Sequence, residues 1–132
     1  MGKMTYQTLQ EKVLTYFRGV DDQNIEMILN TLSKECMFSV ETHNVKLIGH
    51  LAICGMFERL WAHHQWVRHD NFHFVTSHSG SDIAVRFQVT NKLHNGNLVH
   101  KSNCNFFTVK DDLFSEVRVY MSGENTLDAK RS

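Results

Sequence analysis

The sequence predicts one α+β domain in which three N-terminal helices pack in the concavity of a strongly curved, mainly antiparallel sheet. Three observations predict this fold. Helical spacing of apolar residues is confined to the first half of the chain, alternation of apolar and polar residues fills the second half, and short turn signals separate the alternating segments. Because the helices precede the long strands instead of alternating with them, the pattern indicates an α+β cone, with a twisted sheet wrapped around the helices.

Helical spacing predicts three helices. The first covers Thr5–Val20, and one face of it carries Leu9, Val13, Tyr16, Phe17 and Val20. Asp21-Asp22 interrupts the pattern, with one of the two aspartates available as an N-cap, and a short second helix follows with Ile25, Ile28, Leu29 and Leu32. The third helix begins after Gly49 and ends at His63-His64; its apolar residues are Ile53, Met56, Phe57, Leu60 and Trp61.

Alternation predicts five strands. Cys36–His43 is the first, and four long strands follow in the second half of the chain: Trp66–Ser77, Asp82–Leu93, Leu98–Lys110 and Leu113–Met121. Their connections contain Ser79-Gly80, Asn95-Gly96 and Asp111-Asp112, which predicts an antiparallel meander; Asn95-Gly96 is typical of a two-residue type I′ turn. We expect residues 1–132 to form a single domain with an ordered core of about 5–122 and frayed termini.

Composition excludes several classes of partner. Fourteen Lys and Arg balance fourteen Asp and Glu, so no positive field favours nucleic acid or an anionic membrane surface. No apolar run approaches the roughly 20 residues of a membrane span, and no secretory signal is visible. The three cysteines are widely spaced, which favours reduced thiols and a cytoplasmic location.

Nine histidines do not predict a metal site, because their spacing is wrong for one. His69 and His73 share a predicted strand but lie about 13 Å apart at about 3.3 Å per residue, and no His-x-x-x-His occurs on a helix. We therefore expect neither a metal nor another cofactor.

One face of the last three strands is apolar and is expected to point inward. Its members are Ile83, Val85, Phe87, Val89, Phe107, Val109, Val117, Val119 and Met121. The same period places Asn103 and Asn105 on the inward face. Because burying an amide without hydrogen bonds costs about 1 to 3 kcal/mol, these two need partners or a polar ligand.

A candidate catalytic group combines Tyr16, Asp21 and His69 at the inner side or the wide mouth of the cone. A neutral histidine can move a proton near pH 7 when a carboxylate holds its tautomer, so His69 is the candidate base and Asp21 its partner. Tyr16 would donate a hydrogen bond to a substrate oxygen. The substrate-binding candidates are Asn103, Asn105, Phe38, Phe87 and Phe107.

Each of these residues also has a structural interpretation. Asp21 can be a helix cap or a solvated turn residue, and Tyr16 can pack under the sheet with its hydroxyl bonded to the backbone. Arg68-His69-Asp70 can be an exposed run with the neighbouring aromatic residues facing inward, because the sequence does not fix which face of this strand is buried.

The order of elements over about Leu9–Ser122 resembles the SnoaL-like group of the nuclear transport factor two-like superfamily. The segments that carry the resemblance are Tyr16–Asp21 before the second helix, Gly49 before the third, Val67–Asn71 at the opening of the long strands, and Asn103–Phe107 before the last turn. This superfamily has a cone-shaped, cystatin-like α+β barrel and includes scytalone dehydratase, ketosteroid isomerase and bile-acid dehydratase.

The resemblance implies roles for several residues. In the dehydratases an aromatic residue and an Asp on the first helix face a His on a long strand; these match Tyr16, Asp21 and His69. The scytalone dehydratase amide falls on Asn103, and the oxyanion-binding acid of the isomerase falls near Asn105. Two acidic residues of the resembling enzymes are absent from this sequence. The position of the isomerase's general base falls near Val40, and the position of the acid that ends the last strand of many cyclases falls at Ser122.

These observations lead to three hypotheses. The first is a cofactor-independent lyase or isomerase, acting by dehydratase-like proton transfer on a small hydrophobic cyclic or polyketide-like molecule in the cone. The second is a non-catalytic hydrophobic-ligand-binding or dimerising module, favoured by the two missing acids. The third is a protein adaptor, for which no docking motif is present.

A homodimer through the outer sheet face is expected under all three hypotheses. If the inner face is as assigned, the outer face exposes too much aromatic surface for a monomer. Its members are Trp66, Phe72, Phe74, Phe106, Phe114 and Tyr120.

Overall fold

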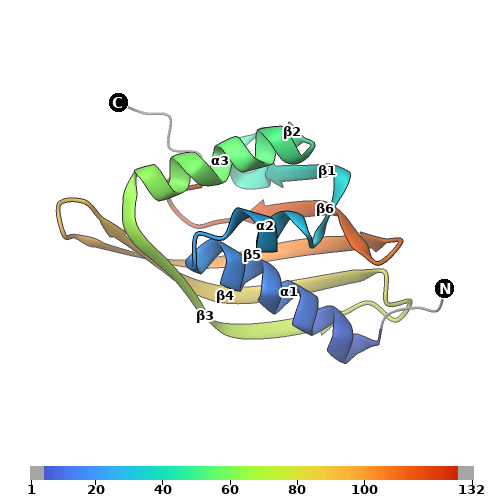
Figure 1. Cartoon of the computed structure of the whole chain (residues 1–132). Helices are drawn as coiled ribbons and strands as arrows, with labels where there is room; N and C mark the ends of the chain where they lie inside the picture. The colour runs from blue at the N-terminus through green and yellow to red at the C-terminus, as the bar shows by residue number, and fades with distance from the viewer. Residues whose placement is uncertain (1–4, 128–132) are drawn as a thin grey trace.

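Three helices lie on the concave side of a curled six-stranded sheet in the computed structural model, which describes residues 5–127 (Figure 1). The helices are α1 (Tyr6–Asp21), α2 (Ile25–Leu29) and α3 (His50–Ala62), with a short 3₁₀ turn η1 (Glu41–His43). The strands are β1 (Leu32–Val40), β2 (Val45–Ile48), β3 (His64–Thr76), β4 (Asp82–Leu93), β5 (Leu98–Lys110) and β6 (Leu113–Tyr120). The predicted α+β class is confirmed.

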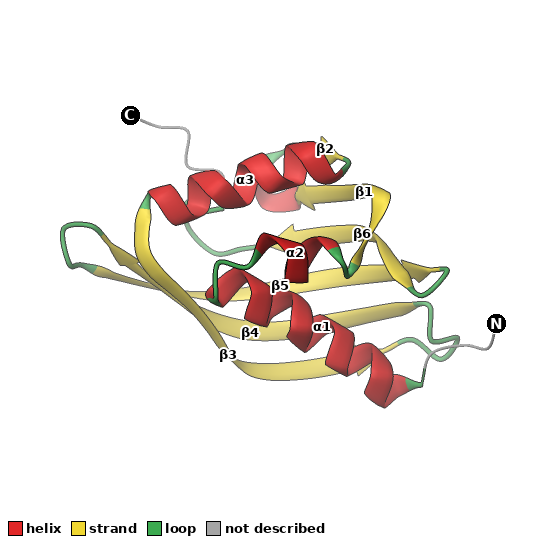
Figure 2. Cartoon of the chain, in the orientation of Figure 1, coloured by secondary structure: helices red, strands yellow, loops and turns green. Residues whose placement is uncertain are grey.

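The sheet has the strand order β2-β1-β6-β5-β4-β3, and the β1–β6 pair is its parallel one. The other neighbouring pairs are antiparallel. Helix α1 packs against β3, and α3 packs against β1 and β3, so that the two long helices close the concave side (Figure 2). Among the described residues no helix combines the length and the apolar character needed to cross a membrane.

The structure corrects the predicted start of the second helix and the predicted first strand. The N-cap of α2 is Asn24, whose side-chain oxygen accepts a hydrogen bond from the Met27 N–H at 3.1 Å, and not one of the two aspartates. Leu32 begins β1 instead of ending a helix. Strand β2 was not predicted, because four residues are too few to show alternation.

The type I′ turn lies at a different hairpin from the one predicted. At Asn95-Gly96 only the glycine has a positive φ, of 92°, and its N–H bonds to the Leu93 carbonyl at 2.9 Å. This is the geometry of a three-residue loop ending in a bulge. Asp111 and Asp112 instead have φ of 54° and 65° and form the two-residue turn between β5 and β6.

A bulge in β3 reverses which residues face the core. The register shifts between Asp70 and His73, where Asn71 has a φ of 56°. Before the bulge Val67 points inward; after it Phe72 packs on the core and His73 is exposed. His69 and His73 therefore lie on opposite faces, contrary to the expectation from strict alternation.

The bulge also reduces the outer aromatic surface. Phe72 and Phe74 pack against the core as a result. A separate register shift in the β5–β6 pair, between Thr108 and Val109, precedes Phe114, which is fully buried. These three residues were wrongly expected outside. Phe106 and Tyr120 are 45% and 40% exposed, with ring centroids 5.7 Å apart. The homodimer remains a prediction that now depends on this smaller surface.

The expected inward row of β4 and β5 is confirmed. Ile83, Val85, Phe87 and Val89 are buried in one core cluster, and Asn103 and Asn105 are buried beside them. Residues 1–4 and 128–132, where fraying was expected, lie outside the described residues. Residues 123–127, beyond the expected core, continue from β6, and Leu127 packs against the core.

Gly19 sets how closely α1 and α2 approach each other. A Cβ built at this position would lie 2.7 Å from Cγ1 of Ile28 and 3.2 Å from the carbonyl oxygen of Asn24. Gly19 is two residues before Asp21, so this close contact also positions the end of α1.

We expect Gly19→Ala to lower the free energy of unfolding by about 1 to 3 kcal/mol, because backbone atoms must move to admit the methyl group. The matched control is Gly55→Ala in the middle of α3, where the nearest atom to the new Cβ is a guanidinium nitrogen of Arg59 at 3.4 Å, an ordinary van der Waals contact. That variant should gain about 0.5 to 1 kcal/mol from helix propensity. Urea unfolding measures both. Equal effects of the two substitutions would contradict the proposed packing role of Gly19.

Candidate active site

The side chain of Asp21 is bound twice by His69, at a position where α1 ends against β3. Asp21 Oδ1 lies 2.6 Å from His69 Nδ1, and Asp21 Oδ2 accepts the backbone N–H of His69 at 2.9 Å. The His69 side chain is 8% exposed and that of Asp21 is 23% exposed. The two candidate residues, 48 positions apart in the sequence, therefore form a fixed pair, and their interpretation as a solvated turn and an exposed polar run is wrong.

Asp21 lies at a position where a carboxylate would destabilise an isolated helix. It is the last residue of α1, where the partial negative charge of the helix C-terminus repels a carboxylate. Two contacts fix this end of the helix: Trp61 Nε1 of α3 donates to the Val20 carbonyl at 2.9 Å, and the Asn24 N–H donates to the Gly19 carbonyl at 2.9 Å. The carboxylate is thus held by tertiary contacts and by its bonds to His69.

The hydrogen bond to Asp21 determines which nitrogen of His69 is free. A carboxylate only accepts hydrogen bonds, so Nδ1 of the neutral ring carries the proton and Nε2 keeps a lone pair. The ring lies between Phe17, at 4.8 Å between centroids, and Phe87, at 5.4 Å. This is a histidine oriented by a carboxylate and enclosed by apolar rings, which is the arrangement of a general base.

His69 lines a small cavity inside the cone. Its free volume is about 20 Å³, which holds about one water molecule. The lining residues come from the helices, the sheet and the C-terminal segment: Tyr16, Phe17, Val20, Phe57, Leu60, Val67, His69, Phe87, Val89, Asn91, Asn103, Asn105, Val119, Thr126 and Leu127. At this volume the cavity is too small for a ring-containing molecule.

Three amides line this mainly apolar cavity. The side-chain oxygens of Asn91 and Asn105 are buried and have no hydrogen-bond partner in the described part of the chain. Asn103 Oδ1 accepts the Ser122 N–H at 3.2 Å. Because an unpaired buried amide oxygen is costly, Asn91 and Asn105 are suited to a hydroxyl or another hydrogen-bond donor of a ligand.

Tyr16 adds a donor to the same cavity. Its ring is 2% exposed and meets Phe107 edge-on at 5.4 Å. Burial, reinforced by the nearby Cys36, raises the pKa of the Tyr16 phenol far above its ordinary value, so the hydroxyl keeps its proton. Within residues 5–127 no hydrogen bond of this hydroxyl occurs, so the alternative in which it bonds to the backbone is not observed.

The structure separates the predicted substrate-binding residues into two groups. Asn103, Asn105 and Phe87 line the cavity. Phe38 and Phe107 do not line it; they are fully buried and pack in the core, Phe38 against Phe57 and Phe107 against Tyr16.

Sequence reasoning missed Asn91 and the C-terminal residues of the cavity wall. Asn91 continues the inward row of Phe87 and Val89 in β4, so the period of two would have found it. Thr126 and Leu127 lie beyond the last strand and carry no periodic signal.

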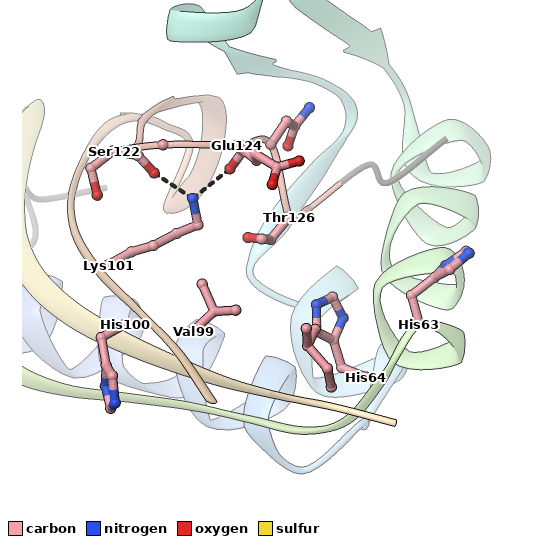
Figure 3. Close-up of a pocket in the computed structure, with 11 residues that line it drawn as sticks. His63, His64, Val99, His100, Lys101, Ser122, Glu124 and Thr126 are labelled. Atoms are coloured by element: carbon pink, nitrogen blue, oxygen red, sulfur yellow. Dashed lines mark hydrogen bonds between the residues drawn. The ribbon is translucent and has the colours of Figure 1, made fainter. Parts of the chain in front are cut away.

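A second, larger cavity has a volume of about 560 Å³ (Figure 3). Thr126 lines both cavities. The other lining residues are His63, His64, Leu93, Val99, His100, Lys101, Ser122, Gly123, Glu124 and Asn125. Burial lowers the pKa of His64, so its ring is neutral at pH 7. Among the described residues no group of three or more His, Cys, Asp or Glu is placed to hold a metal ion.

Solved structures with the same fold confirm the superfamily resemblance at the level of the fold. A candidate polyketide cyclase from Xanthomonas campestris has a TM-score of 0.80, 16% identity, and coverage of 86% of this chain and 90% of that one. One from Silicibacter has a TM-score of 0.79 and 11% identity over 98% and 100% of the two chains. An epoxide hydrolase/cyclase-like enzyme of pyran-ring formation in salinomycin has a TM-score of 0.77 and 18% identity over 88% and 92%.

Other matching structures are described as SnoaL-like, ketosteroid isomerase-like and NTF2-like proteins. The chain therefore shares the fold of these proteins. No protein-family model matches the sequence, and no curated protein matches it.

The unpaired amide of Asn91 predicts a stabilising substitution. Asn91→Leu keeps the shape of the side chain and removes a buried oxygen without a partner, so we expect the free energy of unfolding to rise by about 1 kcal/mol. Asn103→Leu is the matched comparison, because it removes an oxygen that bonds to Ser122, and it should destabilise the protein. Urea unfolding of the two variants checks the expectation, and a loss of stability in Asn91→Leu equal to that in Asn103→Leu would refute it.

Proposed function

We propose that this protein is a cofactor-independent lyase or isomerase that acts by dehydratase-like proton transfer on a small hydrophobic cyclic or polyketide-like molecule. The observation that carries the proposal is the His69–Asp21 pair, with Nδ1 bound to a carboxylate and the ring at the wall of an apolar cavity. Such a pair can remove a proton from carbon when a nearby donor stabilises the developing oxyanion.

The proposed reaction is the elimination of water from a β-hydroxyketone. Nε2 of His69 removes the proton next to the carbonyl, and the electron pair of that C–H bond moves toward the carbonyl oxygen. Tyr16 donates a hydrogen bond to this oxygen, because its phenol stays protonated. The electron pair then forms the C=C bond as the C–O bond breaks, the hydroxyl leaves with the proton from His69 as water, and Asn103 or Asn105 orients it.

Proton transfer without loss of the hydroxyl would give an isomerase from the same residues. The relatives support chemistry on cyclic molecules, since two are candidate polyketide cyclases and a third is an enzyme of pyran-ring formation. At their low identity they support a class of reaction only by analogy.

The alternative is a non-catalytic module that binds a hydrophobic ligand or dimerises. The small volume of the cavity favours this alternative, because catalysis requires the cavity to open.

Under either function, the proposal includes a homodimer through Phe106 and Tyr120 and a cytoplasmic location. The free thiols of Cys36, Cys54 and Cys104 fit a reducing compartment.

We expect the protein to accelerate the conversion of 3-hydroxycyclohexanone to cyclohexenone, followed by the ultraviolet absorbance of the conjugated product. His69→Gln should abolish the acceleration because the base is lost, and Tyr16→Phe should reduce kcat by about 100-fold through loss of the oxyanion donor. His73→Gln is the matched control, because His73 lies on the same strand but on the outer face, and this variant should retain full activity.

Two results would contradict the proposed function. One is an equal rate for His69→Gln and the wild-type protein. The other is binding of cyclic ketones, detected by amide shifts around His69 in NMR spectra, with no turnover and no exchange of the ketone α-protons in D₂O; this would favour the ligand-binding module.

A further inference from the structure

The large cavity contains a buried cation that the proposed mechanism does not use. Lys101 is 6% exposed and is the one buried Lys, Arg, Asp or Glu among residues 5–127. Its ammonium donates to the carbonyl oxygens of Ser122 and Glu124, the latter at 2.5 Å (Figure 3). A buried charge is rarely retained without an opposite charge or a function.

Lys101 belongs to the same row of side chains as the cavity amides. Lys101, Asn103 and Asn105 alternate along β5 and all point inward. Two residues of a strand span about 7 Å, so the Cα of Lys101 is about 7 Å from that of Asn103. One strand therefore presents amides to the small cavity and an ammonium to the large one.

The C-terminal segment 122–127, which we call the strap, lines both cavities: residues 122–126 line the large one, and residues 126 and 127 line the small one. Polar contacts that hold the strap include the two hydrogen bonds from Lys101 and the one from the Ser122 N–H to Asn103 Oδ1. In addition, His43 Nε2 donates to the Gly123 carbonyl at 2.9 Å, and the Ser102 N–H donates to Ser122 Oγ at 3.3 Å. Thr126 of the strap lines both cavities. Displacing the strap would join the small cavity to a volume of about 560 Å³, which is within the range of small-molecule sites.

The charges around Lys101 favour an anion in this space. Burial lowers the pKa of Lys101, and the negative charge of Glu124 opposes this effect. The other titratable side chains that line the large cavity are His63, His64 and His100, none of which brings a negative charge. Glu124 belongs to the strap itself, so strap displacement removes both the carbonyl oxygens and the carboxylate from the ammonium.

We propose that the large cavity is the subsite for the remote part of the substrate, that this part carries a carboxylate, and that Lys101 binds it in place of the strap. This inference rests on the proposed function, because it treats the two cavities as parts of one substrate-binding site. Apolar atoms of the substrate would lie against Val99 and Leu93, between the carboxylate and the oxygen that Asn103 contacts.

The test compares two probes of nearly equal shape, the charged 2-naphthylacetate and its neutral analogue 2-naphthylacetamide. Their binding to the whole chain is measured by calorimetric or NMR titration. We expect the wild-type protein to bind the carboxylate at least about 10-fold more tightly, because a charge-assisted hydrogen bond replaces a neutral one. Lys101→Met should bind both probes equally. Lys110→Met, at the exposed far end of the same strand, should keep the wild-type preference.

A second measurement on the wild-type protein does not depend on the folding of any variant. Addition of 2-naphthylacetate should shift the amide resonances of Lys101, Ser122 and Gly123. The proposal is overturned if neither probe binds at millimolar concentration, if both bind equally to the wild-type protein, if Lys101→Met keeps the preference, or if the shifts lie on another face.

The His69→Gln variant separates this inference from the proposed function. Its preference for the carboxylate should equal that of the wild-type protein, because His69 does not line the large cavity. If His69→Gln loses turnover and keeps its preference for the carboxylate probe, both the catalytic function and the carboxylate subsite are supported. A preference without turnover in the wild-type protein supports the carboxylate subsite and refutes the catalytic function.

Discussion

The double hydrogen bond between Asp21 and His69 is the contact on which the site depends. It joins the end of the first helix to the first long strand, and it uses both carboxylate oxygens, one on the ring and one on the backbone N–H. The backbone bond fixes the distance between the two elements, and the ring bond fixes the tautomer. The two hydrogen bonds with His69 therefore offset the unfavourable position of a carboxylate at a helix C-terminus, and one of them also orients the His69 ring.

The interior combines a well-packed aromatic core with a few polar groups that the fold does not satisfy. Phe17 contacts His69, Phe72 and Phe87, so the His69 ring is held between aromatic rings with little freedom to move. Asn91 and Asn105 bring unpaired oxygens into this apolar surrounding, and Lys101 brings a charge. The two amides line the small cavity and Lys101 lines the large one, and buried polar groups at adjoining cavities are those expected of a binding site.

The fold was largely predictable because its signals are local. The ends of β4 and β5 agree with the alternation, and the helical faces of α1 and α3 agree with the apolar spacing. The predictions that failed concern features set by long-range contacts or by backbone conformation. The positive φ at Asn71 inverts the parity of β3 and leaves no mark in the hydrophobic pattern, so Phe72 was expected on the outer face although it packs against the core. The strap has no periodicity, and its position follows from contacts with Lys101 and Asn103 that form only in the folded chain.

The tautomer of His69 tests the account most directly, because the oriented base is the claim from which the chemistry follows. Nitrogen-15 NMR of the imidazole at pH 8, where an ordinary histidine is neutral, distinguishes the two ring nitrogens. We predict a proton on Nδ1, hydrogen-bonded to Asp21, and an unprotonated Nε2 that changes its shift when a cyclic ketone binds. A ring with its proton on Nε2, or one that exchanges rapidly between the two tautomers, would contradict the assignment of His69 as a base held by Asp21.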